Sequence, residues 1–178
     1  MSRLRLTPAT FADVLRTMRI WANAVERYPS AFAALAEDRL SDLLAATLNA
    51  ALPSAHREVY SRGGKTDIYI TANAVVDGAA AEKVFICESK WWHGKVKAEK
   101  GLEQLFGYLQ VRETSAVLLF FVGSADPQGA RREAIAILKR RPDYKDSDAE
   151  VVSGWPILWF ARRGGIATVC VAFIDVAP

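Results

Sequence analysis

The sequence predicts an α/β fold in which a mixed β-sheet carries helices on its faces. Helical spacing of apolar residues dominates the first fifty positions, and short runs rich in β-branched and aromatic residues then alternate with further helical segments. One of these runs, residues 83–92, is apolar on both faces, which is typical of a central strand covered on two sides. The chain has 178 residues, of which 51% are hydrophobic, so a single packed domain is expected.

Two helices are expected before the first strand. The first covers residues 11–26 and ends at the Tyr-Pro-Ser turn of 28–30, and the second covers residues 30–51 and is stopped by Pro53. The leucines of the second helix recur at intervals of three and four residues, as one apolar face requires. These leucines are Leu40, Leu43, Leu44, Leu48 and Leu52.

Strands are expected in the middle of the chain. Residues 58–60 form a short strand, Gly63-Gly64 a turn, and residues 66–71 a strand of β-branched and aromatic residues. Asp77-Gly78 is a hairpin signal, and it leads into the central strand 83–92. The sequence therefore predicts an antiparallel pair whose second member is buried.

Helices and strands alternate in the rest of the chain. Residues 98–111 and 130–140 are predicted helices, and residues 115–122, 157–160 and 166–176 are predicted strands. The predicted order is helix, helix, three strands, helix, strand, helix and two strands.

Composition indicates no membrane segment. The longest apolar run, residues 116–123, is far too short to span a bilayer, and the N-terminal segment lacks the continuous apolar stretch of a signal peptide.

Cys87 and Cys170 lie in apolar runs without a second cysteine or a histidine at metal-ligand spacing. We therefore expect buried free thiols in a reducing, cytoplasmic compartment.

Basic residues gather in two places although the net charge is only +3. Such clusters neutralise phosphates in nucleic-acid-binding proteins, and they are equally common on solvated helix faces. The second cluster comprises Arg131, Arg132, Lys139, Arg140 and Arg141. The first comprises Lys90, Lys95, Lys97 and Lys100, and the candidate nucleic-acid contacts around it are Lys65, Trp92, His93, Lys95 and Lys97.

Three residues could form a metal-dependent site. Asp67 stands near the start of one predicted strand, and Glu88 and Lys90 stand at the end of the next. Residues two apart in a strand share a face, and antiparallel pairing brings the start of one strand beside the end of the other. Two adjacent carboxylates favour a hard divalent cation between them. An E-x-K triplet alone is a weak signal, because it also marks the point where a strand meets solvent.

The combination of an Asp-led strand, a hairpin, an E-x-K strand and an amphipathic helix resembles the PD-(D/E)XK nuclease superfamily. The resemblance covers about residues 30–122. It implies a restriction-endonuclease-like mixed sheet with the core order α-β-β-β-α-β, flanked by helices. The N-terminal helix and the C-terminal α-β-β elements of 128–178, with their extra strands, would be additions to this core within a single nuclease domain.

Individual residues match the motifs of that superfamily. Thr66 replaces the proline that precedes the first aspartate, Asp67, and Glu88-Ser89-Lys90 matches the (D/E)XK motif. Gln104 and Tyr108 resemble the Q-x-x-x-Y motif of RecB-like members, and residues four apart share a helix face. Without the resemblance, this glutamine and tyrosine would be read as a surface residue and a packed aromatic.

The resemblance implies a role for each matching residue. Asp67 and Glu88 would bind Mg²⁺ or Mn²⁺ with the backbone carbonyl of Ser89, and Lys90 would position the attacking water. Gln104 and Tyr108 would orient Lys90 or the nucleic-acid strand.

The superfamily also supplies an acid from its first core helix. Glu37, Asp38 and Asp42 are candidates for it. Glu37 is preferred because it lies three residues before Leu40, on the stripe that faces the sheet. It would act through a water molecule or a second ion.

The implied function is a Mg²⁺-dependent nuclease, an endonuclease whose expected substrate is DNA and not RNA, within a defence or DNA-repair system. The oligomeric state stays open, although a homodimer is suggested because duplex cleavage in this superfamily often needs two active sites. Two alternatives stay open. One is a non-catalytic nucleic-acid-binding module that retains the nuclease fold, and the other is a protein-interaction domain whose acids are structural.

Overall fold

The computed structural model describes residues 10–52, 55–61, 66–76, 79–109 and 115–177, and for 55–61, 66–67, 69–76 and 79–84 it describes the backbone alone. The helices are α1 (Phe11–Arg27), α2 (Pro29–Phe32), α3 (Glu37–Ala51), α4 (Lys95–Tyr108) and α5 (Pro127–Lys139). The strands are β1 (Ala55–Ser61), β2 (Thr66–Val76), β3 (Ala79–Trp91), β4 (Ser115–Val122), β5 (Tyr144–Asp148), β6 (Ile157–Arg162) and β7 (Gly165–Asp175).

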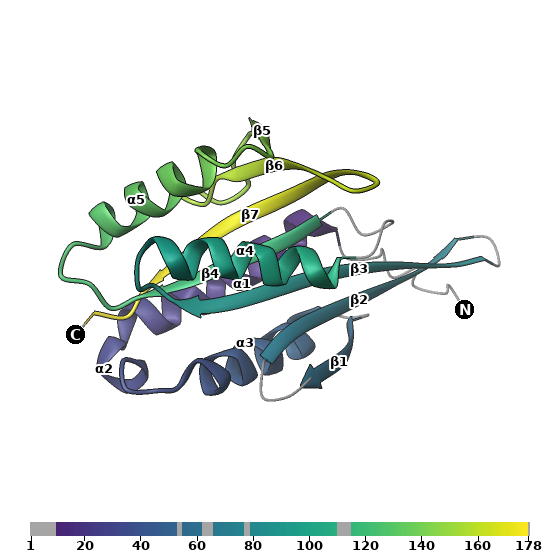
Figure 1. Ribbon diagram of the computed structural model, residues 1–178. Helices are drawn as coiled ribbons and strands as arrows, with labels where there is room; N and C mark the ends of the chain where they lie inside the picture. The colour runs from purple at the N-terminus through teal and green to yellow at the C-terminus, as the bar shows by residue number, and fades with distance from the viewer. Residues whose placement is uncertain (1–9, 53–54, 62–65, 77–78, 110–114, 178) are drawn as a thin grey trace.

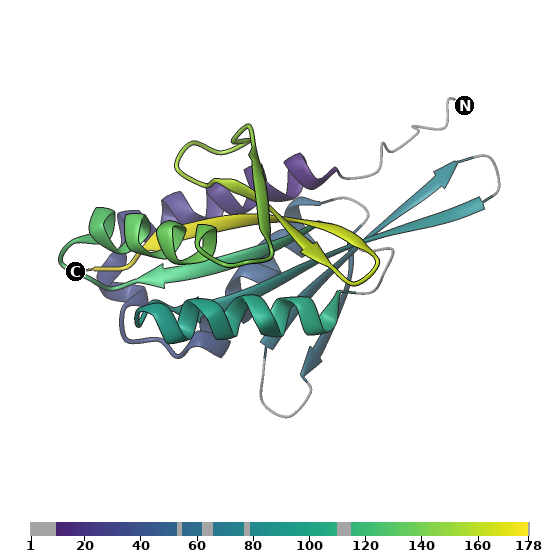
Figure 2. The same cartoon turned by 45° about the horizontal axis from the view of Figure 1, so that its top comes forward.

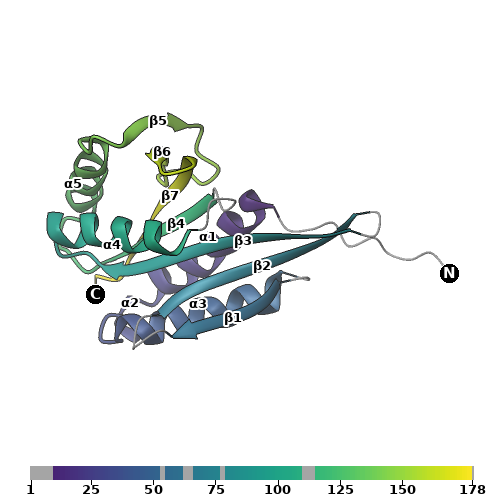
Figure 3. The same cartoon turned by 45° about the vertical axis from the view of Figure 1, so that its right-hand side comes forward.

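All the strands form one mixed sheet in the order β1-β2-β3-β4-β7-β6-β5. The three central strands, β3, β4 and β7, run parallel, and the pairs on either side of them are antiparallel. Helices α1 and α3 lie on one face of the sheet and α4 and α5 on the other (Figure 3). The predicted α/β class, with a mixed sheet flanked by helices and extra C-terminal strands, is therefore confirmed.

The parallel strands direct their carboxyl ends to one side of the molecule. The ends of β3 and β7 lie there together with α2 and the C-terminus (Figure 1). At the opposite side β2 and β3 continue past the helices as a two-stranded arm (Figure 2). The arm comprises residues 73–76 of β2 and 79–82 of β3, and in the described ladders these residues pair only with each other. Residues 77–78, the predicted hairpin turn, lie outside the described residues, as does the predicted turn at Gly63-Gly64.

Two predicted elements need correction. The helix predicted for 30–51 is broken into α2 and α3, with Ala36 in extended conformation between them. The intervening segment is rich in alanine, which favours a helix, so local propensity does not explain the break. The sequence also gave no sign of β5, a polar edge strand that pairs only with β6 and so needs no apolar face.

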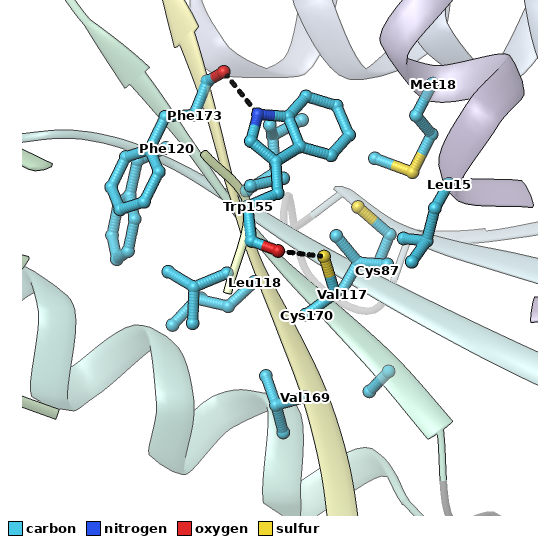
Figure 4. Packing of buried hydrophobic residues seen from close by; sticks show 14 of the residues in the cluster. Leu15, Met18, Cys87, Val117, Leu118, Phe120, Trp155, Val169, Cys170 and Phe173 are labelled. Carbon is cyan, nitrogen blue, oxygen red and sulfur yellow. Dashed lines mark hydrogen bonds between the residues drawn. The ribbon is translucent and has the colours of Figure 1, made fainter. Parts of the chain in front are cut away.

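The interior is packed around the carboxyl half of the sheet. Trp155 is fully buried and donates its indole N–H to the carbonyl of Phe173 at 3.0 Å (Figure 4). Cys87 and Cys170 are buried free thiols, and burial, reinforced by the negative charge of Glu150, raises the pKa of Cys170 to about 12. None of the helices that the structure describes is both long and apolar enough to cross a bilayer.

Candidate functional site

The carboxyl end of β3 holds a buried ion pair. Glu88 is 1% exposed, and its Oε1 atom lies 2.5 Å from the Nζ atom of Lys90. Because a desolvated carboxylate is costly without a counter-charge, the ammonium group accounts for the burial of Glu88. The two side chains share a face of the strand, as their spacing predicts.

Glu37 approaches the same ammonium group from α3. Its Oε1 atom lies 3.3 Å from Nζ of Lys90, and its Oε2 atom accepts the backbone N–H of Trp91 at 3.1 Å. The break between α2 and α3 makes Glu37 the first residue of α3, where the positive end of the helix dipole stabilises a carboxylate. Lys90 therefore lies between two carboxylates from different elements.

The other two acids considered for this role lie elsewhere. Asp38 is exposed, and Asp42 lies 4.0 Å from Arg39 on the outer side of α3. Among the three candidates, the structure places Glu37 beside Lys90.

Asp67 enters the site through the register of the sheet. Within the described residues the β2–β3 ladder begins with Asp67 directly opposite Glu88. Residues opposite each other in an antiparallel ladder are about 4.5–5.5 Å apart at Cα and share a face. The backbone thus brings Asp67 next to Glu88, while the Asp67 side chain, like the whole of Lys65, lies outside the described part of the chain.

A buried hydroxyl pair, which the sequence did not predict, fixes α3 against β3. The Oγ atoms of Ser41 and Ser89 are 2.5 Å apart, and both residues are almost fully buried. Serine is usually solvated on a helix, so the only available signal was the position of Ser41 next to Leu40 on the apolar stripe. The pair holds α3 in the register that aligns Glu37 with Lys90.

Lys90 retains its proton at neutral pH. Burial lowers the pKa of Lys90, but the hydrogen bonds and negative charges of Glu88 and Glu37 raise it by more, so the net shift is upward. A lysine with a raised pKa donates hydrogen bonds and supplies positive charge, and it is unsuited to act as a general base. The upward shift therefore keeps Lys90 positively charged between the two carboxylates.

Helix α4 lies close over this end of β3. A Cβ atom at Gly101 would lie 3.3 Å from Cγ of Lys90 and 3.1 Å from Leu118, so glycine permits the close approach. Helix α4 connects the parallel strands β3 and β4, so it runs antiparallel to β3. The residues that follow Gly101 in α4 therefore lie further toward Glu88 along β3. Gln104 and Tyr108 follow along the helix and are both half-buried.

The predicted nucleic-acid contacts surround the start of α4. Lys95, Lys97 and His93 are exposed, and Lys95 forms a weak surface pair with Glu99 at 3.8 Å. Trp92 is half-buried and packs edge-on against Phe120. These residues continue directly from Lys90, so their exposed parts border the candidate site.

Two of the five residues in the second basic cluster pair with acids inside the fold. Arg131 pairs with Asp175 at 2.6 Å, and Arg141 pairs with Asp143 at 2.9 Å. The other three, Arg132, Lys139 and Arg140, are exposed.

A divalent cation fits the donor set at the end of β3. Two carboxylates, Glu88 and Glu37, already converge on one cationic group, and the backbone of a third acid, Asp67, lies opposite Glu88. Within the side chains that the structure describes, no group of three or more acidic, histidine or cysteine residues comes together. Asp67, whose backbone lies opposite Glu88, is therefore the candidate for a third carboxylate at this point.

Comparisons with known proteins add little to this picture. No protein-family model matches the sequence, and no curated protein matches it significantly. One similar solved structure is that of the DNA modification-dependent restriction endonuclease AspBHI, with 22% sequence identity and a TM-score of 0.32. The match covers 74% of this chain and 32% of the length of that chain. At that TM-score the likeness carries no argument about activity, and the α/β assignment rests on the strand order described above.

Proposed function

We propose that this chain is a divalent-metal-dependent nuclease that hydrolyses phosphodiester bonds in DNA. The observation that carries the proposal is the position of the Lys90 ammonium group between Glu88 and Glu37, at a point where Asp67 is the register partner of Glu88. The resemblance to the PD-(D/E)XK motifs supports the proposal at Asp67, Glu88 and Lys90, while Thr66 departs from the motif. The fold class alone would support many other functions.

The residues divide the chemistry among them. Asp67 and Glu88, with the backbone carbonyl of Ser89, would hold Mg²⁺ or Mn²⁺, and Glu37 would join through water or a second ion. A bound divalent ion polarises a phosphoryl oxygen and acidifies a coordinated water. Lys90 donates hydrogen bonds to the attacking water or to a phosphoryl oxygen and offsets the negative charge that develops on it.

The surrounding elements keep the reacting groups in place. The Trp91 N–H fixes the Glu37 carboxylate, and α4 presses against the stem of Lys90 through Gly101. Gln104 and Tyr108, one and two turns further along α4, would orient Lys90 or the DNA backbone. Water attacks phosphorus and the P–O3′ bond breaks, which leaves a 5′-phosphate and a 3′-hydroxyl, the products that the resemblance implies.

The proposal is tested by incubating the chain with labelled single-stranded DNA, duplex DNA and RNA in Mg²⁺, Mn²⁺ or EDTA. We expect DNA cleavage with either metal and none with EDTA. The variant Glu88→Gln removes one ligand charge at constant shape, and it should abolish cleavage.

Glu133→Gln is the matched control, because Glu133 is an exposed acid on α5 outside the site. It should cleave like the wild type. DNA binding by both proteins without cleavage in any metal would instead favour the non-catalytic binding module, and neither binding nor cleavage would favour a protein-interaction domain.

A further inference from the structure

A concave pocket with a volume of about 670 Å³ opens at the carboxyl ends of the parallel strands. Its lining includes Trp91, the last residue of β3, together with Ser124 and Val176, which follow β4 and β7. This is the side of an α/β sheet where ligands usually bind, and the volume lies within the range of about 300–1,000 Å³ typical of small-molecule sites.

The pocket adjoins the candidate nuclease site through the backbone. Its lining contains Leu35, two residues before Glu37, and Trp91, the residue after Lys90. The Glu37 carboxylate accepts the Trp91 N–H at 3.1 Å and lies 3.3 Å from the Lys90 ammonium group. A phosphate bound at Lys90 would therefore lie near the pocket.

The walls present flat aromatic surfaces that are already held in position. Trp92 meets Phe120 edge-on at 5.5 Å, and the Trp91 ring packs against Phe121 at 5.8 Å. Both tryptophans are half-buried, so part of each indole stays open to the pocket. The exposed His93 adds a polar ring. Rigid aromatic faces with a few polar groups favour a planar, polar ring system such as a nucleobase.

A glycine keeps the pocket open on the β4 side. A Cβ atom at Gly123 would lie 3.4 Å from Cζ3 of Trp91, an ordinary contact that places any larger side chain against the indole. Gly123 is not among the glycines with positive φ, so a substitution there fills space without straining the backbone.

We infer that this pocket receives one unpaired nucleobase of the DNA strand, next to the phosphate that is cleaved. The inference rests on the proposed function and deepens it by naming the substrate class. A base inside a duplex is stacked and paired on all sides and must be extruded before it can enter a pocket, and this extrusion is easiest in single-stranded DNA. The chain therefore prefers single-stranded DNA, or DNA with an unpaired nucleotide at the cleavage site, over fully paired duplex.

The experiment places one abasic site at each successive position of a labelled single-stranded oligonucleotide and maps cleavage at every phosphate. For the wild type, one abasic position relative to the scissile bond should lower the cleavage rate roughly tenfold, the effect expected from losing one base–aromatic stack. Trp92→Ala should lower cleavage of the intact oligonucleotide by a similar factor and should be insensitive to the abasic site.

Two further variants separate loss of the pocket from loss of the fold. Gly123→Leu fills the pocket but keeps both tryptophans, and it should reproduce the Trp92→Ala pattern. Tyr28→Ala is the matched control, because Tyr28 is an exposed aromatic residue outside the pocket lining, and it should keep the wild-type pattern.

The outcomes distinguish the pocket from the nuclease. Cleavage that ignores the abasic position and survives both pocket variants overturns the pocket and leaves the nuclease intact. If no protein cleaves, anisotropy measurements of oligonucleotide binding with Ca²⁺ decide. Base-dependent binding that both pocket variants lose supports the pocket without the nuclease, and the absence of such binding overturns both.

Discussion

Two charge networks lie at the ends of β3 and β7, which β4 separates in the sheet, and they differ in charge balance. At the end of β3, the single ammonium group of Lys90 contacts the carboxylates of Glu88 and Glu37, and Asp67 is placed opposite Glu88 by the register. At the end of β7, guanidinium and carboxylate groups match one to one. Arg131 pairs with Asp175, and Arg19 pairs with Glu26, whose Oε1 atom accepts the Asp175 N–H.

The balanced network connects the layers of the fold. Arg131 on α5 lies over the ring of Phe173, and Arg19 on α1 lies over the ring of Trp155. Through Asp175, the network ties helices from both faces of the sheet to β7. Each charge has a partner of opposite sign, so no further cation is required.

Among the side chains that the structure describes, the network at β3 joins two carboxylates to one ammonium group. Buried carboxylates that outnumber their counter-ions raise each other's pKa unless another cation joins them. Under the proposed function, the comparison teaches that an excess of carboxylates, more than burial or the number of ion pairs, would separate a metal site from a structural network.

The largest difference should appear in activity. Glu88→Gln and Lys90→Met should each lower the cleavage rate by about a thousandfold, the loss typical of removing one preorganised charged group. Arg131→Met should keep the wild-type rate within about threefold. Single-turnover cleavage of single-stranded DNA in Mg²⁺ measures both, and a large loss in the Arg131 variant would remove the distinction between the networks.

Much of the β3 network was predictable, because its signals are local. Glu88 and Lys90 are two residues apart on one strand, and the hairpin signal at 77–78 implied the antiparallel pairing that the β2–β3 ladder shows. Glu37 was selected from its spacing to Leu40, although the helix that contains it begins later than predicted.

The remaining features depend on contacts between distant parts of the chain. The Ser41–Ser89 hydrogen bond joins residues 48 positions apart, and the Glu26–Asp175 contact joins residues 149 positions apart. The pocket combines the segment before α3 with three strand ends. No spacing rule for a single helix or strand predicts such combinations, and the polar strand β5 lacks the alternation that a strand prediction needs.

Metal binding should distinguish the networks by a smaller effect. A ligand at one hundred times its dissociation constant stabilises the folded state by about 2.7 kcal/mol. For a chain of this size that corresponds to a rise of about 5–10 °C in the unfolding midpoint. Thermal unfolding with and without Mn²⁺ should show this rise in the wild type and in Arg131→Met but not in Glu88→Gln. An equal rise in all three would place the metal elsewhere.

The free energy of unfolding should rank the variants in the opposite order to the cleavage rate. Arg131→Met leaves Asp175 without its cation, and it should lower the free energy of unfolding by about 2 kcal/mol, between the values for exposed and buried pairs. Glu88→Gln removes a carboxylate from an acid-rich site, and Lys90 keeps Glu37, so the metal-free protein should lose less than about 1 kcal/mol. Urea unfolding in EDTA measures both. A larger loss in Glu88→Gln would show that the β3 network is primarily structural.

A pH-dependent effect is expected in the apolar interior beside the balanced network. Cys170 packs near Trp155, its thiol 4.0 Å from the Trp155 carbonyl, and its pKa is raised by burial to about 12. The unfolded chain loses this proton near the ordinary cysteine pKa of about 8.5, whereas the folded chain keeps it.

Raising the pH above about 9 therefore favours unfolding by up to about 1.4 kcal/mol per pH unit. The full stabilising contribution of the buried thiol is present only below that pH. Cys170→Ala should lack this slope, so the difference in unfolding free energy between the two proteins should shrink from pH 8 to about pH 10. Parallel slopes for the two proteins would show that the thiol is accessible to solvent, and that the interior beside the balanced network is less tightly closed than its packing indicates.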